Sequence, residues 1–425
     1  MDTNFPQDWE TVKNRLVHRF LTYVTIGTAS DNHIAATPST PGQWDLAKLL
    51  AAELRGLGLQ EVILTEHCYV LARLPATAGK EEAPVLGLAA HLDTSPDAPG
   101  ANVRPQVRIA YKGEPIVLAD GLTLDPRTDA DLAAQIGGDI IHSDGSTLLG
   151  ADDKAGIAEI MGVIEYLLDH PAIEHGPVEI LFTPDEETGK GLPELPREAL
   201  RSQVYFTLDG GPKGELEIEC FNAYGVEVRC RGKAIHPGAA RGVLVNAALM
   251  AAAFALMLPR TESPEATDGY YGYYCLMGIK GNHEEASLEL IIRDFDLEQA
   301  KRRVAALECF AQAVEAQFPG GAVQVDAKAQ YYNMRQKIEE RPQILALLKQ
   351  AAAEIGLEFR LKPIRGGTDG SRLTELGIPA PNIFTGGRNY HSRMEWVSVS
   401  DMIDACRLVT ALIRLWAKQR PEAAG

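Results

Sequence analysis

The stretch "VLGLAAHLD" (residues 85–93) joins an almost entirely apolar run to His91 and Asp93. A short strand without polar positions is typical of a sheet whose two faces are both covered. Helices usually provide that cover, and the polar pair then lies at the carboxyl end of the strand. The stretch therefore predicts an α/β fold with chemistry at one edge of its sheet.

Helix and strand patterns alternate around this strand. Residues 40–58 have leucines at helical spacing, and we expect Thr40 to cap the helix with Gln43 closing a capping box. A second helix is expected over 154–170. Further strands are expected over 61–65, 69–74, 178–182 and 203–208. This alternation predicts a mixed, mostly parallel sheet covered by helices.

The pattern changes near residue 215, where strand and helix signals follow in the order β-α-β-β-α-β. That order is typical of a split βαβ, ferredoxin-like α+β domain. After it, helices over 342–356 and 401–418 resume the earlier style, with short strands over 359–364 and 380–384. We therefore predict a discontinuous catalytic domain, 1–214 and 333–425, interrupted by an inserted domain, 215–332.

Composition excludes several classes of protein. A net charge of −17 over 425 residues argues against nucleic acid or an anionic membrane as a partner. The start "MDTNFPQDWE" lacks a secretory pattern, and the apolar run 247–258 is too short to span a bilayer. Six cysteines without a CxxC pair are expected to be reduced. A cytoplasmic enzyme or binding protein is the expectation.

Acidic and histidine side chains lie where predicted strands end or helices begin. They are His91, Asp93, Asp152, Asp153, Glu186, Glu187, Asp209 and His391. Because the carboxyl ends of parallel strands meet at one edge, these side chains are expected to converge. Imidazole together with carboxylates suits divalent zinc, cobalt or manganese. Each motif alone also has a structural reading, as a solvated turn or a helix cap, and only the combination favours a site.

Spacing suggests how these groups divide their work. Asp93 lies two residues after His91, so its carboxylate can accept the imidazole N–H and fix the ring. Asp152, at a helix N-terminus, can offer its two oxygens to two cations. Adjacent residues of extended chain point to opposite sides, so Glu186 and Glu187 are expected to have different roles. One would bind metal and the other would act as general base.

Seven motifs together carry a resemblance to a known family. They are "HLDTSPD" (91–97), "TLLGADDKAG" (147–156), "FTPDEETGKG" (182–191), "HPG" (236–238), "YYNMR" (331–335), "PIRGGTDG" (363–370) and "FTGGRNYH" (384–391). In this order they resemble the tripeptide aminopeptidase (peptidase T) branch of the co-catalytic two-zinc metallopeptidases. That family also contains carboxypeptidases, dipeptidases and deacylases.

The resemblance implies a role for each site residue and a cofactor of two divalent ions, zinc first, with cobalt or manganese as alternatives. His91 and Asp209 would hold one ion, Glu187 and His391 the other, and Asp152 would bridge them. Two further residues complete the catalytic centre: Asp93 would orient His91, and Glu186 would be the general base. The resemblance also implies a cis peptide between the residues at 152 and 153.

The inserted domain resembles the family's lid, which also mediates dimerisation in some members, so a homodimer is among the expected assemblies. His236 would stabilise the charge that develops on the scissile carbonyl, and Arg335 and Arg365 would grip a peptide carboxylate. Arg335 in an interdomain salt bridge and "GGTDG" as a flexible turn remain alternatives.

The resemblance as a whole implies a metal-dependent aminopeptidase. It would release the N-terminal residue from tripeptides with a free N-terminus, using a metal-activated bridging water. A related dipeptidase, carboxypeptidase or acyl-amino-acid deacylase is the alternative within the family. A non-catalytic peptide-binding or metal-binding module is the alternative outside it.

Overall fold

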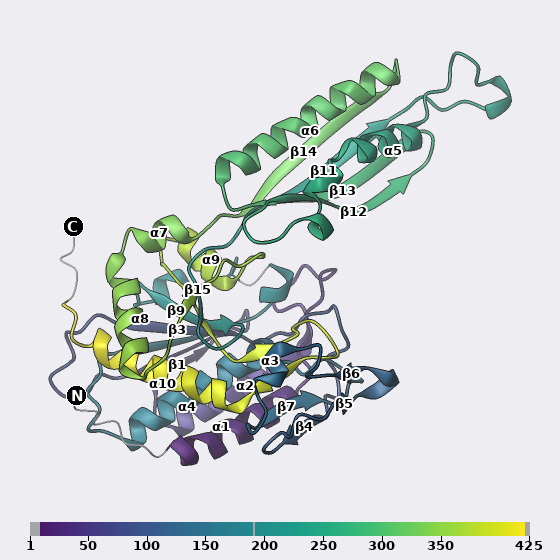
Figure 1. The fold of residues 1–425 in the computed structure, drawn as a ribbon. Coiled ribbons are helices and arrows are strands. Elements are labelled where there is room, and N and C mark those ends of the chain that lie inside the picture. The colour runs from purple at the N-terminus through teal and green to yellow at the C-terminus, as the bar shows by residue number, and fades with distance from the viewer. Residues whose placement is uncertain (1–8, 190–191, 421–425) are drawn as a thin grey trace. The chain divides into compact units, whose positions relative to one another are not determined.

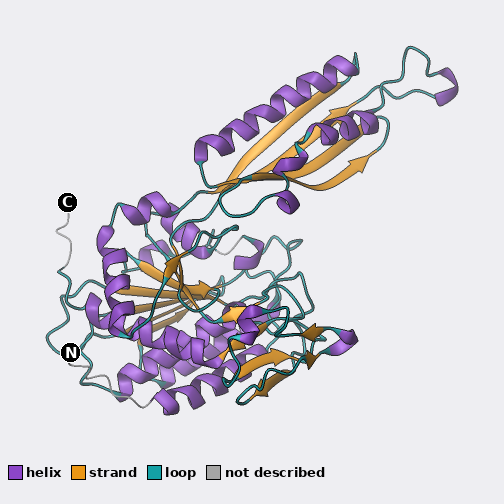
Figure 2. Ribbon diagram, in the orientation of Figure 1, coloured by secondary structure: helices purple, strands orange, loops and turns teal. Residues whose placement is uncertain are grey.

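The computed structural model describes residues 9–189 and 192–420, shown as ribbons in Figures 1 and 2. Two compact units are present. The main unit comprises the described residues of Met1–Ile218, Lys337–Lys362 and Thr368–Gly425, and the inserted unit comprises Glu219–Gln336 and Pro363–Gly367. The predicted motif 182–191 ends in Lys190 and Gly191, which lie outside the described residues.

An eight-stranded mixed sheet forms the centre of the main unit, in the order β1-β2-β8-β3-β9-β16-β10-β15. These strands are β1 (Gln60–Leu64), β2 (Val70–Leu74), β3 (Leu86–His91), β8 (Val178–Thr183), β9 (Tyr205–Gly210), β10 (Glu215–Glu217), β15 (Arg360–Leu361) and β16 (Asn382–Phe384). The four central strands β8, β3, β9 and β16 run parallel. Strands β3 and β8 are buried at every position, and for β3 this confirms the burial predicted from its apolar composition. The carboxyl ends of β3, β8 and β9 consequently meet at one edge.

Helices cover this sheet. They are α1 (Trp9–Val24), α2 (Pro41–Gly56), α4 (Ala151–Asp169), α8 (Pro342–Glu354), α9 (Asp369–Glu375) and α10 (Val399–Trp416). Helix α4 packs on β3 and β9 and also contacts α1 and α10, which lie beside it in Figure 1. It begins before the predicted start at residue 154, although Asp152 and Asp153 have non-helical dihedral angles. Helix α4 therefore presents two irregular acidic residues at the edge of the sheet.

A second, small sheet is not predicted by the sequence. Two of its strands come from residues 94–147, where the apolar residues follow neither a helical nor a strand period. It contains β17 (Gly387–Arg388), β18 (Trp396–Ser398), β7 (Ile140–Ser143) and β4 (Pro105–Arg108), in that order. The same region also holds β5 (Ile116–Val117), β6 (Thr123–Leu124) and the short helix α3 (Ala130–Ala133). Strands this short carry too few residues for a period of two to stand out. This sheet ties the segment that carries His391 to β7.

The inserted unit has the predicted β-α-β-β-α-β order. Its elements are β11 (Asn222–Arg231), α5 (Ala247–Met257), β12 (Tyr273–Gly281), β13 (Glu285–Asp294), α6 (Leu297–Gln317) and β14 (Ala322–Tyr331). The strands form one antiparallel sheet in the order β12-β13-β11-β14, which is the ferredoxin-like arrangement. Phe254, Leu288, Ile292 and Leu307 are fully buried between the helices and the sheet.

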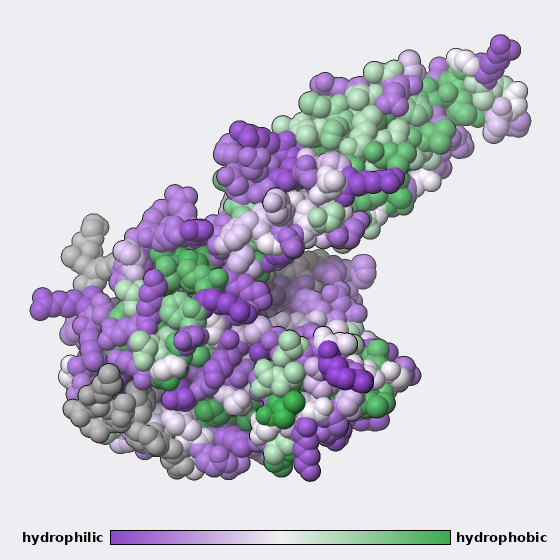
Figure 3. All heavy atoms as spheres, in the orientation of Figure 1, coloured by the Kyte–Doolittle hydropathy of each residue, from purple (hydrophilic) through white to green (hydrophobic). Residues whose placement is uncertain are grey.

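Apolar side chains also lie on the outside of the inserted unit. Leu249 and Leu256 of α5 and Leu276, Met277 and Ile279 of β12 are exposed. Hydrophobic residues gather over this part of the unit in Figure 3. Because β12 is an edge strand, its backbone also offers hydrogen-bonding groups that the sheet does not use.

Two compositional expectations can be compared with the structure. All six cysteines are free, and Cys68, Cys220, Cys230 and Cys406 are buried. Among the described residues, no helix has both the length and the apolar character needed to cross a membrane.

Candidate metal centre

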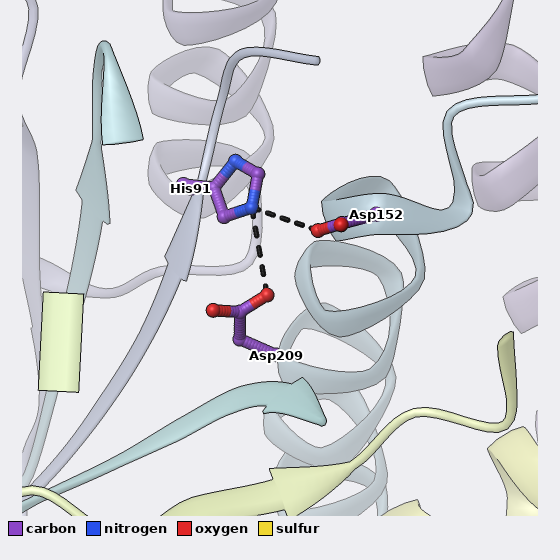
Figure 4. A group of neighbouring side chains, drawn as sticks. All are labelled: His91, Asp152 and Asp209. Carbon is purple, nitrogen blue, oxygen red and sulfur yellow. Dashed lines mark hydrogen bonds and ion pairs between the residues drawn. The ribbon is translucent and has the colours of Figure 1, made fainter. Parts of the chain in front are cut away.

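The first group of convergent ligands contains His91, Asp152 and Asp209 (Figure 4). His91 is the last residue of β3, Asp209 lies near the end of β9, and Asp152 lies in the irregular first turn of α4. The Nε2 atom of His91 is 2.9 Å from Asp152 Oδ1 and 3.5 Å from Asp209 Oδ1. The two strand ends and the helix start thus direct one imidazole and two carboxylates at a common point.

The second group contains Asp152 again, with Glu187 and His391. His391 Nε2 is 3.0 Å from Glu187 Oε2 and 3.3 Å from Asp152 Oδ2. Asp152 therefore turns one oxygen to each group. The peptide between Asp152 and Asp153 is cis, as the resemblance implies.

These residues fit a pair of divalent cations. Within each group the candidate ligand atoms lie within 4.8 Å of one another. Glu187 Oε1 is buried and accepts no hydrogen bond, a costly arrangement for a carboxylate oxygen unless a cation faces it. Imidazole nitrogen and carboxylate oxygen are the ligand types that zinc, cobalt and manganese accept.

Protons compete with metal for these groups. Burial and the neighbouring Asp152 raise the pKa of Glu187 to about 7. Burial, followed by the charge of Asp152, raises the pKa of Asp209 to about 6. Hydrogen bonds to Asp152 and Glu187 raise the pKa of His391 to about 11. Because metal needs neutral imidazole and ionised carboxylate, binding of metal must displace these protons.

Asp93 positions two parts of the centre. The imidazole Nδ1 of His91 is 3.0 Å from the backbone oxygen of Asp93, whereas its nearest carboxylate oxygen is 3.4 Å away. The carboxylate also accepts the backbone N–H groups of Glu186 at 3.0 Å and Glu187 at 3.1 Å. Asp93 thus orients His91 mainly through its backbone and orients the Glu186–Glu187 turn through its side chain.

Asp185, the first of three adjacent acidic residues, has a structural role. Its carboxylate accepts bonds from Ser39 N at 2.7 Å, Ser39 Oγ at 2.5 Å and Gln43 Nε2 at 2.7 Å. The capping box predicted for Thr40 and Gln43 is therefore wrong: Thr40 makes no side-chain cap bond. The side chain of Gln43 instead bonds to both the carboxylate and the backbone N–H of the distant Asp185. These bonds fix the turn that carries Glu186.

Glu186 belongs to neither ligand group. Burial raises its pKa well above the usual range, which favours a carboxylate that takes up a proton readily. A neighbour that sequence reasoning missed, Asp369 of α9, accepts a hydrogen bond from Thr183 Oγ1 at the end of β8. Burial raises the pKa of Asp369 to about 7.

Two more acidic residues around the centre were missed. Asp97 Oδ2 lies 3.2 Å from His391 Nδ1, the imidazole nitrogen that faces away from Glu187. Glu395 is buried and accepts three backbone N–H groups at the start of α4. Asp97 could have been found from the sequence, because it ends the motif "HLDTSPD". For Glu395 the sequence offers only its position four residues after His391.

The remaining predicted residues lie in the inserted unit. His236 is exposed, and its Nδ1 accepts the N–H of Gly238 at 3.1 Å. Arg335 pairs with Glu219 at 3.3 Å, an ion pair inside this unit rather than between domains.

Arg365 is held by backbone and aromatic groups. It donates to the backbone oxygens of Gly269 at 2.7 Å and Tyr271 at 3.0 Å. Its guanidinium also lies over the rings of Phe221 and Tyr273. These contacts keep the segment 363–367 within the inserted unit.

Two relatives named Peptidase T are similar to this chain over nearly its whole length. Peptidase T of Geobacillus thermodenitrificans (strain NG80-2) is 45% identical over 410 residues, which cover 96% of this chain and 100% of that protein. Peptidase T of Bacillus subtilis (strain 168) is 42% identical over the same coverage.

Solved structures show the same fold. Aminopeptidase PepT from Bacillus cereus ATCC 10987 superposes with a TM-score of 0.74 at 23% identity, covering 96% of this chain and 99% of that one. A dinuclear metal-binding M20 peptidase, the YXEP protein of Bacillus subtilis, has a TM-score of 0.65 at 15% identity and covers 95% of this chain and 98% of its own. The sequence model of Peptidase family M20/M25/M40 matches residues 140–415. The chain belongs to this peptidase family.

Proposed function

We propose that this protein is a metal-dependent aminopeptidase that releases the N-terminal residue from tripeptides. The observation that carries the proposal is the pair of ligand groups that share Asp152, with Glu186 beside them but in neither. Full-length relatives named Peptidase T support the tripeptide substrate. A related dipeptidase, carboxypeptidase or deacylase would use the same ligands but is not favoured by those relatives.

The proposed cofactor is two divalent ions, zinc first. His91 and Asp209 would hold one, Glu187 and His391 the other, and Asp152 both. When bound, such ions polarise a carbonyl and make water acidic enough to attack it near neutral pH. Glu186 would accept the proton of the attacking water and return it to the departing amine. Asp93, which holds the backbone of Glu186, keeps that carboxylate in place.

The inserted unit is proposed to complete the site as a lid. His236 would stabilise the negative charge on the carbonyl oxygen. Arg335 is 49% exposed and would grip the carboxylate of the peptide. Arg365, whose guanidinium donates to Gly269 and Tyr271, is proposed for the same task. Lid closure would limit the length of the peptide, because a closed pocket cannot accommodate a long chain.

A panel of peptides tests the activity. The zinc-loaded or cobalt-loaded protein is incubated with matched di-, tri- and tetrapeptides, each with a free or an acetylated N-terminus, and products are identified by mass spectrometry. Release of the first residue from free tripeptides alone is the expected result. Cleavage of dipeptides, trimming from the C-terminus or removal of the acetyl group would contradict the tripeptidase assignment.

The division of labour between Glu186 and Glu187 is tested by Glu186→Ala. We expect the variant to keep its metal while hydrolysis falls at least 10²-fold to 10⁴-fold, roughly the usual contribution of a general base. Metal content is measured by atomic absorption after gel filtration, with the exposed Glu198→Ala as the matched control. Equal loss of metal and activity would show that Glu186 is a ligand instead.

A homodimer is proposed for this enzyme, and a cytoplasmic location stays a prediction from the sequence. The exposed apolar side chains of α5 and of the edge strand β12 support self-association through the inserted unit. Light scattering after gel filtration tests it, since a dimer has about twice the 46.1 kDa mass of the chain.

A further inference from the structure

Glu395 lies directly before β18 and is only 1% exposed. Its Oε2 atom accepts the backbone N–H groups of Leu149 at 2.7 Å and Gly150 at 2.8 Å. Its Oε1 atom accepts the backbone N–H of Asp152 at 3.1 Å. Both oxygens of one buried carboxylate are therefore committed to the loop that carries the shared ligand of the two metal groups.

That loop has no cap of its own. The residue in the N-cap position of α4 is Gly150, with φ of 84°, and glycine has no side chain to accept the first N–H groups of the helix. Asp152 follows with φ of −88° and ψ of 101°, outside the helical region. Glu395, more than two hundred residues away in the chain, supplies the acceptor atoms that a local N-cap would normally provide.

A buried carboxylate also needs compensation of its charge. Lys154 is fully buried in the first turns of α4 and attracts Glu395 electrostatically. Its Nζ atom donates to the backbone oxygen of Ile26 at 2.7 Å. Glu395 is thus a buried charge whose hydrogen bonds are satisfied by the loop that carries Asp152 and whose charge is balanced by Lys154.

We propose that Glu395 is a positioning residue that fixes Asp152 so that its two oxygens face both metals, and that this makes the binding of the two ions interdependent. The proposal rests on the two-ion site proposed above. Asp152 Oδ1 lies 2.9 Å from the imidazole of His91, and Oδ2 lies 3.3 Å from that of His391. A bridging carboxylate tolerates little displacement, so its anchored backbone matters to both ions.

The chain connection strengthens this coupling. Glu395 and His391 lie on the same short segment, which β18 attaches to β7. A shift of this segment would move a ligand of one ion and the anchor of the shared ligand together. Loss of Glu395 should consequently lower the affinity of the protein for both ions, not only for the one that His391 binds.

The hydrogen-bond pattern distinguishes a positioning role from a role of charge alone. All three partners of Glu395 are N–H donors, so both side-chain oxygens must accept. In Glu395→Gln one oxygen becomes an NH₂ group, a donor that cannot accept from another donor. Glu395→Gln should therefore behave almost like Glu395→Ala, and Glu395→Asp, which is one methylene shorter, should lie between these variants and the wild type.

The test measures metal binding to the full-length protein without peptide. Apo-protein is titrated with Co²⁺ alone, by calorimetry and by the visible absorption of the cobalt, at a temperature where circular dichroism shows every variant folded. We expect Glu395→Gln to bind both ions about 10-fold to 100-fold more weakly, the usual effect of losing a support of a metal ligand. The visible spectrum of the bound cobalt should change as well.

Glu179→Gln is the matched control. Glu179 is also fully buried, and its carboxylate accepts backbone N–H groups of Arg201 and Ser202 at 3.0 Å. It lies at the start of β8, away from the ligand-bearing strand ends. We expect this variant to lower the stability of the protein but to keep the wild-type affinity for cobalt.

Three results would overturn the proposal: wild-type cobalt affinity and spectrum in Glu395→Gln, loss of one ion only, or equal loss of affinity in Glu179→Gln. If Glu395→Gln does not fold, Glu395→Asp decides, because unchanged cobalt affinity in that variant contradicts the proposed anchor. The readout involves no peptide, so failure of the tripeptidase assignment would leave it unaffected.

Discussion

Replacing Gly156 by alanine should disturb both the stability and the metal centre, because α4 and β9 touch at this glycine. A Cβ atom here would lie 1.8 Å from the backbone oxygen of Leu208 and 2.5 Å from Asp153 Oδ1. An ordinary C···O contact is about 3.3 Å, so α4 would have to move by about 1.5 Å. The nearest atom belongs to the backbone of β9 and cannot rotate away, so the helix itself must shift.

The size of the effect follows from two opposing contributions. Overpacking costs about 3 kcal/mol at its upper end, whereas alanine gains about 1 kcal/mol over glycine in a helix. We expect a net loss of about 2 kcal/mol in the free energy of unfolding of the main unit. Because α4 carries Asp152, a displacement of about 1 Å should also lower kcat about 10²-fold.

Urea denaturation followed by circular dichroism measures the stability, and initial rates on a tripeptide measure the activity. Gly162→Ala in the same helix is the control, because its Cβ would meet nothing closer than Leu16 Cδ1 at 3.6 Å. That variant should be more stable than the wild type by about 0.5–1 kcal/mol and fully active. If Gly156→Ala were as stable and as active as Gly162→Ala, the claimed contact between α4 and β9 would be wrong.

Two further outcomes are expected. Asp185→Ala should lower the free energy of unfolding by about 2–4 kcal/mol in urea, because Ser39 and Gln43 lose a buried charged acceptor. In metal-free protein the pKa values of Glu187, about 7, and Asp209, about 6, lie above those of the unfolded chain. The stability from these two groups is therefore present below about pH 4 and is lost as the pH rises through 6 to 7. Metal binding strengthens over the same range, so the melting-temperature gap between zinc-loaded and chelated protein should widen from pH 5 to pH 8. A constant gap in scanning fluorimetry would contradict this reasoning.

Long, strongly patterned elements could be predicted from sequence alone. The helix expected over 342–356 is α8 (Pro342–Glu354), and the apolar run at 85–90 became the buried centre of the sheet. The small sheet of β4, β7, β17 and β18 could not be predicted. Its strands are short and come from both ends of the chain, so their pairing depends on tertiary contacts that no local pattern records.

The same distinction applies to the candidate site. Residues at strand ends, such as His91 and Asp209, could be placed together because parallel strands share an edge. The carboxylates of Asp93, Asp185 and Glu395 accept backbone or amide N–H groups from distant segments. Which donor faces a carboxylate depends on the folded path of the chain, so these roles had no signature in the sequence.

The interrupted chain path has a consequence for protein synthesis. A ribosome completes His91, Asp152 and Asp209, and with them one ligand group, before it begins the inserted unit. His391 and the strand β16, which joins β9 to β10 in the sheet, emerge only after the inserted unit has been made. A nascent chain that lacks His391 cannot assemble the paired centre. The hydrolytic activity proposed here would therefore arise only after the inserted unit and the segment that carries His391 have both been made.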